Sequence, residues 1–181
     1  MGRRVNLDDA VAALQERLRR YRPDRYPVQH ATAQFHLGQA LLQAGRSRDA
    51  LAALRTSTAL FDPRMLPVEH AKAQNLLGAA LRGEGDVKAA RAAFARAADV
   101  FAEHGLDAER AAAVFNLGLV AVDAGNPAAA AELFAEAGQR FAATGARAQT
   151  AAASLQLGSA LLAAGEPERA CEALQRAADL A

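Results

Sequence analysis

A leucine followed by a glycine occurs four times in this 181-residue chain, each time forty residues after the last. The pairs are Leu37-Gly38, Leu77-Gly78, Leu117-Gly118 and Leu157-Gly158. A further glycine and an alanine recur at the same interval, in the columns Gly45, Gly85, Gly125, Gly165 and Ala50, Ala90, Ala130, Ala170. A fixed period of roughly 20 to 50 residues is the signature of repeat architectures, so the chain must fold as a series of similar units.

Each repeat is predicted to form two helices separated by a turn that contains glycine. Alanine, leucine and arginine dominate the chain while β-branched and aromatic residues are scarce, which favours helix throughout. The Gly45 column can adopt φ > 0 and so end the first helix of each unit. Residues suited to begin the second helix follow directly, with Ser47, Asp86 and Asn126 as N-caps and Pro127 and Pro167 in the first turn.

The small residues in constant columns predict close contact between the two helices of a unit. Packed helix axes lie about 8 to 10 Å apart, and the closest approaches need side chains that occupy little space. The Gly38 and Ala50 columns meet this need, and a column of large apolar residues fills the space beside them: Leu54, Phe94, Phe134 and Leu174. We therefore assign these columns to the core.

These columns resemble the signature of the tetratricopeptide repeat (TPR), in which Leu-Gly and a large apolar residue precede alanine, phenylalanine and alanine. In the second repeat, residues 67–101, the matching residues are Leu77, Gly78, Leu81, Ala90, Phe94 and Ala97. The aromatic that usually precedes Leu-Gly is absent, and the step of forty exceeds the usual length of about 34, as in long-repeat arrays. The resemblance implies an all-α fold: an α-solenoid of antiparallel helix pairs forming a right-handed superhelix.

We expect one repeat domain over residues 1–181. Its four helical hairpins should span 27–61, 67–101, 107–141 and 147–181. The segment 7–21 aligns with the second helix of a further unit and is expected to form an N-terminal capping helix.

The fourth hairpin has no helix after it to provide the polar outer face that terminal repeats normally carry. One interpretation is a homodimer through the last helix pair, involving Leu161, Leu162, Cys171, Leu174 and Ala178. The other is that the chain is part of a longer protein. The sequence leaves both open.

Charge and cysteine content argue against several classes of function. The net charge of +1 is too small for general nucleic-acid binding, although seven arginines and four acidic residues lie within residues 1–25. We interpret that segment, which includes Arg3 and Arg4, as a solvated helix face, with an acidic or phosphate-bearing partner as the alternative. Cys171 is the only cysteine, which precludes an intramolecular disulfide, and we expect it to be buried. No signal peptide or membrane span is predicted, so a cytoplasmic location is the default.

No catalytic, cofactor-binding or metal site is predicted. The sequence has no nucleophile elbow, phosphate-binding loop or pair of histidines one helical turn apart. His30 and His70 occupy the same column of successive repeats, which are about 10 Å apart. Zinc–nitrogen bonds measure about 2.0 to 2.1 Å, so the two histidines are too far apart to bind one metal ion. We therefore expect these two histidines to be structural.

The TPR resemblance implies a concave groove lined by the first helix of each hairpin. Helical spacing selects the following candidates for binding a partner: Phe35, His36, Gln39, Lys72, Asn75, Arg82, Phe115, Asn116 and Gln156. The two asparagines suit a peptide backbone and the two cations suit a carboxylate. The two phenylalanines could anchor an apolar side chain or pack between repeats.

A non-catalytic module that binds a peptide or helix of a partner protein is the function we expect. A ligand-responsive regulatory domain and an accessory subunit of an enzyme are the alternatives. The identity of the partner does not follow from the sequence, because many functions share one repeat architecture.

Overall fold

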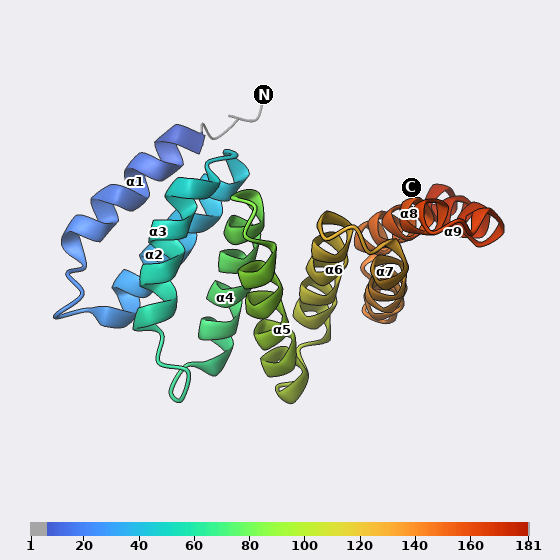
Figure 1. The fold of residues 1–181 in the computed structure, drawn as a ribbon. Helices are drawn as coiled ribbons and strands as arrows, with labels where there is room; N and C mark the ends of the chain where they lie inside the picture. Colours follow the sequence, from blue (N-terminus) through green and yellow to red (C-terminus); the bar gives the residue numbers. More distant parts are fainter. Residues whose placement is uncertain (1–6, 181) are drawn as a thin grey trace, which may run out of the picture. The chain divides into compact units, whose positions relative to one another are not determined.

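A computed structural model describes residues 7–180 of the chain, and this part is all-helical, with nine helices and no strand (Figure 1). The helices are α1 (Leu7–Arg20), α2 (Pro27–Gln43), α3 (Ser47–Leu60), α4 (Pro67–Gly83), α5 (Val87–Glu103), α6 (Asp107–Asp123), α7 (Pro127–Ala143), α8 (Arg147–Ala163) and α9 (Pro167–Leu180). The predicted all-α repeat fold is confirmed. Arg3, Arg4 and Ala181 lie outside the described residues.

The chain divides into two compact units, and the division falls within α5, between Ala93 and Phe94. In the first unit α2 packs against α1, α3 and α4, and α3 also packs against α4. In the second unit α6 packs against α7, α7 against α8, and α8 against α9. The predicted capping helix therefore forms as α1. Two of the second helices of the hairpins, α5 and α7, extend two residues beyond the Phe61 column.

Glycines with positive φ end the first helix of each hairpin, as predicted. The φ angles are +72° at Gly45 and +71° at Gly125. The Gly45 N–H donates to the Leu42 carbonyl at 3.0 Å, and the Arg46 N–H donates to the Leu41 carbonyl at 2.8 Å. These two bonds form a Schellman motif, which satisfies carbonyls left open at a helix C-terminus.

Two of the three predicted N-caps are confirmed and one is wrong. Oδ1 of Asp86 accepts from the Ala89 N–H at 3.0 Å, and Oδ1 of Asn126 accepts from the Ala129 N–H at 3.1 Å. Ser47 is instead the first residue of α3, and Arg46 takes the cap position without a side-chain cap bond. The Schellman turn is complete at the residue after the glycine, so the cap column holds Arg46 in the first hairpin and Asp86 and Asn126 in the next two.

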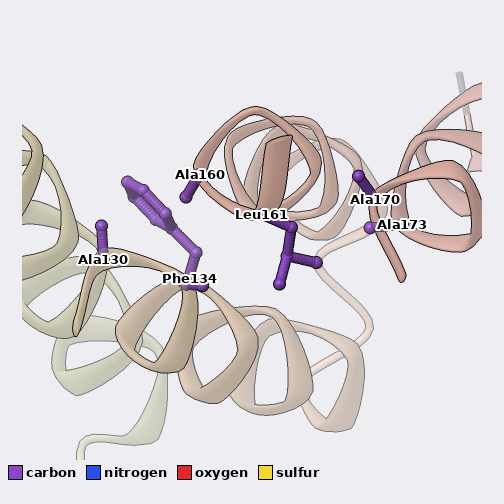
Figure 2. Packing of buried hydrophobic residues seen from close by; sticks show 7 residues of the cluster. Ala130, Phe134, Ala160, Leu161, Ala170 and Ala173 are labelled. Atoms are coloured by element: carbon purple, nitrogen blue, oxygen red, sulfur yellow. The ribbon is translucent and has the colours of Figure 1, made fainter. Parts of the chain in front are cut away.

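Small residues allow the helices of the second unit to pack closely. A Cβ added at Gly118 would lie 2.6 Å from Cε1 of Phe134, and one added at Gly158 would lie 2.6 Å from Cγ of Leu174. Phe134 and Leu161 are buried in one cluster together with alanines of α7, α8 and α9 (Figure 2). The packing role predicted for the Gly38 column is therefore confirmed at both glycines.

Replacing Gly118 by alanine should destabilise the second unit. Alanine gains helix propensity of about 1 kcal/mol over glycine, but displacing the buried Phe134 ring costs about 1 to 3 kcal/mol, so a net loss is expected. Gly138 is the matched control, because its added Cβ would lie 3.5 Å from Ala153, an ordinary contact. Urea unfolding followed by circular dichroism should show Gly118→Ala destabilised and Gly138→Ala unchanged or stabilised. Equal changes in stability for the two variants would contradict the role of Gly118 in the close packing of α6 against α7.

The cap assignments predict different responses at Asn126 and Ser47. Asn126→Ala removes the hydrogen bond to the Ala129 N–H and should lower the free energy of unfolding by about 1 kcal/mol. Ser47→Ala removes no cap bond and should change the free energy of unfolding by less than about 0.5 kcal/mol. The same urea measurement compares the two variants, and a larger loss at Ser47 would be inconsistent with a cap at residue 46.

Candidate partner-binding site

The first unit places six of the predicted groove residues on the neighbouring helices α2 and α4. Phe35, His36 and Gln39 lie on α2, and Lys72, Asn75 and Arg82 lie on α4. His36, Gln39 and Lys72 are exposed, whereas Asn75 and Arg82 are half-buried. None of Lys72, Asn75 and Arg82 is without an interaction partner within the chain. Two cations and two amide groups therefore lie on helices that pack against each other.

The two aromatic candidates take part in packing between helices. Phe35 is half-buried and packs against the cluster of Ala31, Phe61 and Ala73, with its ring centroid 5.2 Å from that of His36. Phe115 is half-buried, and its centroid lies 5.2 Å from that of Phe134. Of the two roles that the sequence left open for these phenylalanines, the structure favours packing.

The second unit has a hollow of about 220 Å³ between α6 and α8. It is lined by Val122, Gly125, Pro127, Gln156, Ser159, Ala160 and Ala163. Gln156 is a predicted groove residue, and Asn116, also half-buried, lies on α6. The same helical spacing also selects Ser159 and Ala163, whereas Val122, Gly125, Pro127 and Ala160 were missed. Val122 is 47% exposed although it is apolar. The equivalent residues of the two preceding repeats are Leu42 and Arg82, so the residue types at this position do not predict whether it is exposed.

His30 and His70 form the same structural joint in successive hairpins. Nδ1 of His30 lies 2.6 Å from the Tyr21 carbonyl oxygen, and Nδ1 of His70 lies 2.9 Å from that of Phe61. A carbonyl only accepts, so each Nδ1 donates and Nε2 can accept from the amide of Gln34 or Gln74 at 3.3 Å. Each histidine thus ties the start of one hairpin to the end of the preceding helix, and the predicted structural role is confirmed.

The last helix pair differs from the prediction at two residues. Cys171 is exposed, so its predicted burial is wrong, because its face of α9 has no neighbouring helix in the described chain. Leu161 is only 2% exposed and belongs to the core cluster, so it cannot form part of a dimer surface. Leu174 is half-buried beside Gly158, whereas Leu162 is 55% exposed.

The described arginines at the start of the chain lie in solvent. Arg19 pairs with Glu16 at 3.0 Å and Arg22 pairs with Asp24 at 3.2 Å, and all four side chains are more than half exposed. Exposed pairs of this kind contribute at most about 1 kcal/mol. Their placement agrees with a solvated face.

Two searches of residues 7–180 bear on other kinds of function. No three histidine, cysteine or acidic side chains in this part come together as potential metal ligands. Over the same residues, every helix is too short or too polar to cross a membrane.

The fold and the surfaces described above define an all-α protein built from repeated helical hairpins. The tetratricopeptide-repeat family profile matches residues 3–61, 36–103, 76–143 and 116–181, so the chain belongs to the TPR family. No curated protein sequence matches it.

Similar solved structures include those of three other proteins. MamA has a TM-score of 0.70 and 21% identity, over 96% of this chain and 88% of MamA. A putative kinesin light chain from Podosopora anserina with nearly identical TPR-like repeats has a TM-score of 0.67 and 22% identity, over 96% and 83%. The Rap conjugation gene regulator of plasmid pLS20, solved with the Phr* peptide, has a TM-score of 0.77 and 19% identity, over 97% and 48%. At these identities the comparisons establish the fold.

The packing of Phe115 predicts a stability effect that a groove residue would not show. Phe115→Ala should lower the free energy of unfolding by about 2 to 3 kcal/mol, because it removes a half-buried ring from the core. Gln156→Ala, in the hollow of the same unit, should change the free energy of unfolding by less than about 0.5 kcal/mol. Urea titration of both variants tests the distinction, and a Phe115 variant as stable as the parent would argue against the packing role.

Proposed function

We propose that this chain is a non-catalytic interaction module that binds a peptide or helix of a partner protein along the first helices of its hairpins. Membership of the TPR family supports this class of function. The observation that carries the proposal is the hollow between α6 and α8, since ligand sites are typically concave and mainly apolar with a few polar groups.

The chemistry of the two surfaces indicates what kind of segment would bind. The lining of the hollow favours an apolar side chain, and the amide of Gln156 offers both a donor and an acceptor for a peptide backbone. On α2 and α4, Lys72 and Arg82 favour a carboxylate. Taken separately, the hollow of the second unit suits an apolar side chain of a partner, and α2 and α4 of the first unit suit an acidic segment.

The Rap conjugation gene regulator supports the proposal at the level of fold. It was solved in complex with the Phr* peptide, and about half of that chain has an arrangement of helices similar to this one, which supports a peptide as the kind of ligand proposed here.

A charge reversal on α4 tests the proposal. The full chain, immobilised as bait in native lysate, should enrich at least one protein in quantitative mass spectrometry. The double variant Lys72→Glu/Arg82→Glu should reduce that enrichment at least about tenfold, equivalent to about 1.4 kcal/mol, because it would repel an acidic segment.

The control variant Arg55→Glu/Arg64→Glu makes the same change in charge away from α2 and α4 and should bind normally. Circular dichroism should confirm that both double variants are folded. Full recovery of the partner by the α4 variant, or no specific partner for the parent chain, would contradict the proposal.

A regulatory domain that changes shape on binding a peptide is the second candidate, and the peptide complex of the Rap gene regulator favours it. This function adds one requirement, namely that the radius of gyration from X-ray scattering changes when the captured segment is added. An unchanged radius with a bound peptide would leave only the interaction module.

A further inference from the structure

Three helices of the second unit, α7, α8 and α9, surround a further hollow of about 170 Å³. It shares no lining residue with the hollow between α6 and α8. Its walls are mainly apolar, and all of them belong to helices of the described chain. We refer to this space as the three-helix hollow, and its lining includes Phe134, Gly138, Ser154, Leu157 and Arg176.

Larger side chains occupy the equivalent place in the first unit. The residues of α4 that correspond to Thr150 and Ser154 of α8 are His70 and Gln74, forty and eighty residues being one and two repeats. Both are half-buried, and His70 is hydrogen-bonded to the carbonyl of Phe61 at the end of the preceding helix. Threonine and serine are smaller than histidine and glutamine, so the three-helix hollow is the space that the smaller pair leaves beside α7.

Gly138 is a further small residue of the hollow, and helix packing does not require it. It lies in the interior of α7, where glycine is less favourable than alanine. An added Cβ would have only Ala153 nearby, at an ordinary 3.5 Å, whereas the equivalent residues of the other repeats are Thr58, Ala98 and Ala178. Departures from local preference of this kind are expected where a sequence serves binding and not stability.

The hydroxyl of Ser154 is a buried polar group that faces this space. Ser154 is 5% exposed and lines the hollow. The Thr150 hydroxyl, also in the lining, donates to the Ala146 carbonyl at 2.9 Å, but the Ser154 hydroxyl has no hydrogen bond to any residue of 7–180. Buried hydroxyl groups are normally hydrogen-bonded, so Ser154 offers a donor to a molecule that enters the hollow.

Arg176 gives the open edge of the hollow a positive charge. Its side chain is exposed, and it forms no ion pair with another residue of the described chain. Glu172 and Asp179 lie about one turn away on α9, and Asp179 accepts instead from the Gln175 amide at 2.9 Å. A guanidinium in this position favours a carboxylate, which can accept two parallel hydrogen bonds from it.

We propose that the three-helix hollow binds a small carboxylic acid with an apolar body about the size of a benzene ring. An apolar cavity of about 150 Å³ in another protein binds benzene, so a hollow of about 170 Å³ has the right size for such a body. Leu157 and Ala142 contact the body, and Arg176 holds the carboxylate at the open edge, where water still solvates it. The site is separate from the surfaces proposed above for a partner protein.

Titration of the isotope-labelled full chain with phenylacetate, followed by heteronuclear NMR, tests the site. Saturable shifts should appear at residues of α7, α8 and α9 that line the hollow, with an affinity in the millimolar range, as expected for a ligand of this size. Phenylacetamide, which has the same body without the charge, should bind at least about fivefold more weakly. Acetate, which lacks the apolar body, should give no saturable shift.

Three variants test the roles of the lining residues. Arg176→Gln should weaken phenylacetate binding at least about fivefold, because it removes the charged donor. Ser154→Gln, which restores the residue type of Gln34 and Gln74, should fill the hollow and abolish binding. Arg169→Gln makes the same change as Arg176→Gln at an arginine of α9 that does not line the hollow, and it should bind like the parent. Circular dichroism should show that all three variants are folded.

Three results would overturn the proposal. One is the absence of saturable shifts with phenylacetate, and another is equal affinity of the parent and Arg176→Gln. The third is a set of shifts centred on Val122 and Gln156, which would assign the acid to the hollow between α6 and α8. Failure of the chain to capture a partner protein would leave the three-helix hollow unaffected, so the two proposals can fail separately.

Discussion

The close approach of helices at glycine and alanine columns is the constraint on which the rest of this structure depends. At Gly118 and Gly158 no methyl group fits without displacing Phe134 or Leu174. Because those contacts recur every forty residues, the hairpins share one geometry and present equivalent columns to their neighbours. The hollow between α6 and α8 follows from it, since it is lined by residues of two consecutive hairpins.

Most of the fold could be predicted because the decisive residues act locally. Proline begins α2 and α4, and glycine with positive φ ends the first helix of each hairpin, so the helix bounds follow from backbone preferences. The misplaced cap at Ser47 shows the limit of this reasoning, because serine is a good cap in general but the turn had already ended one residue earlier. Gly45 was the better guide to that position.

The candidate site was less predictable because burial depends on residues distant in sequence. Phe35 and Phe115 occupy groove columns, but each is half-buried against a cluster that includes a residue of the next hairpin, Ala73 for Phe35 and Ala153 for Phe115. Cys171 was expected to be buried by its residue type, whereas its exposure reflects what lies beside α9. A hollow such as that around Gln156 is formed by the space between side chains, which no single column reports.

The sequential packing of α6, α7, α8 and α9 also bears on how the second unit acquires its structure. Each helix meets a neighbour reached through a turn of a few residues, so the chain loses little entropy when contacts close. Topologies dominated by such short-range contacts fold quickly, commonly in microseconds to milliseconds. Assembly of this unit can therefore begin at any hairpin and spread in both directions, a property that a fold with distant strand pairings lacks.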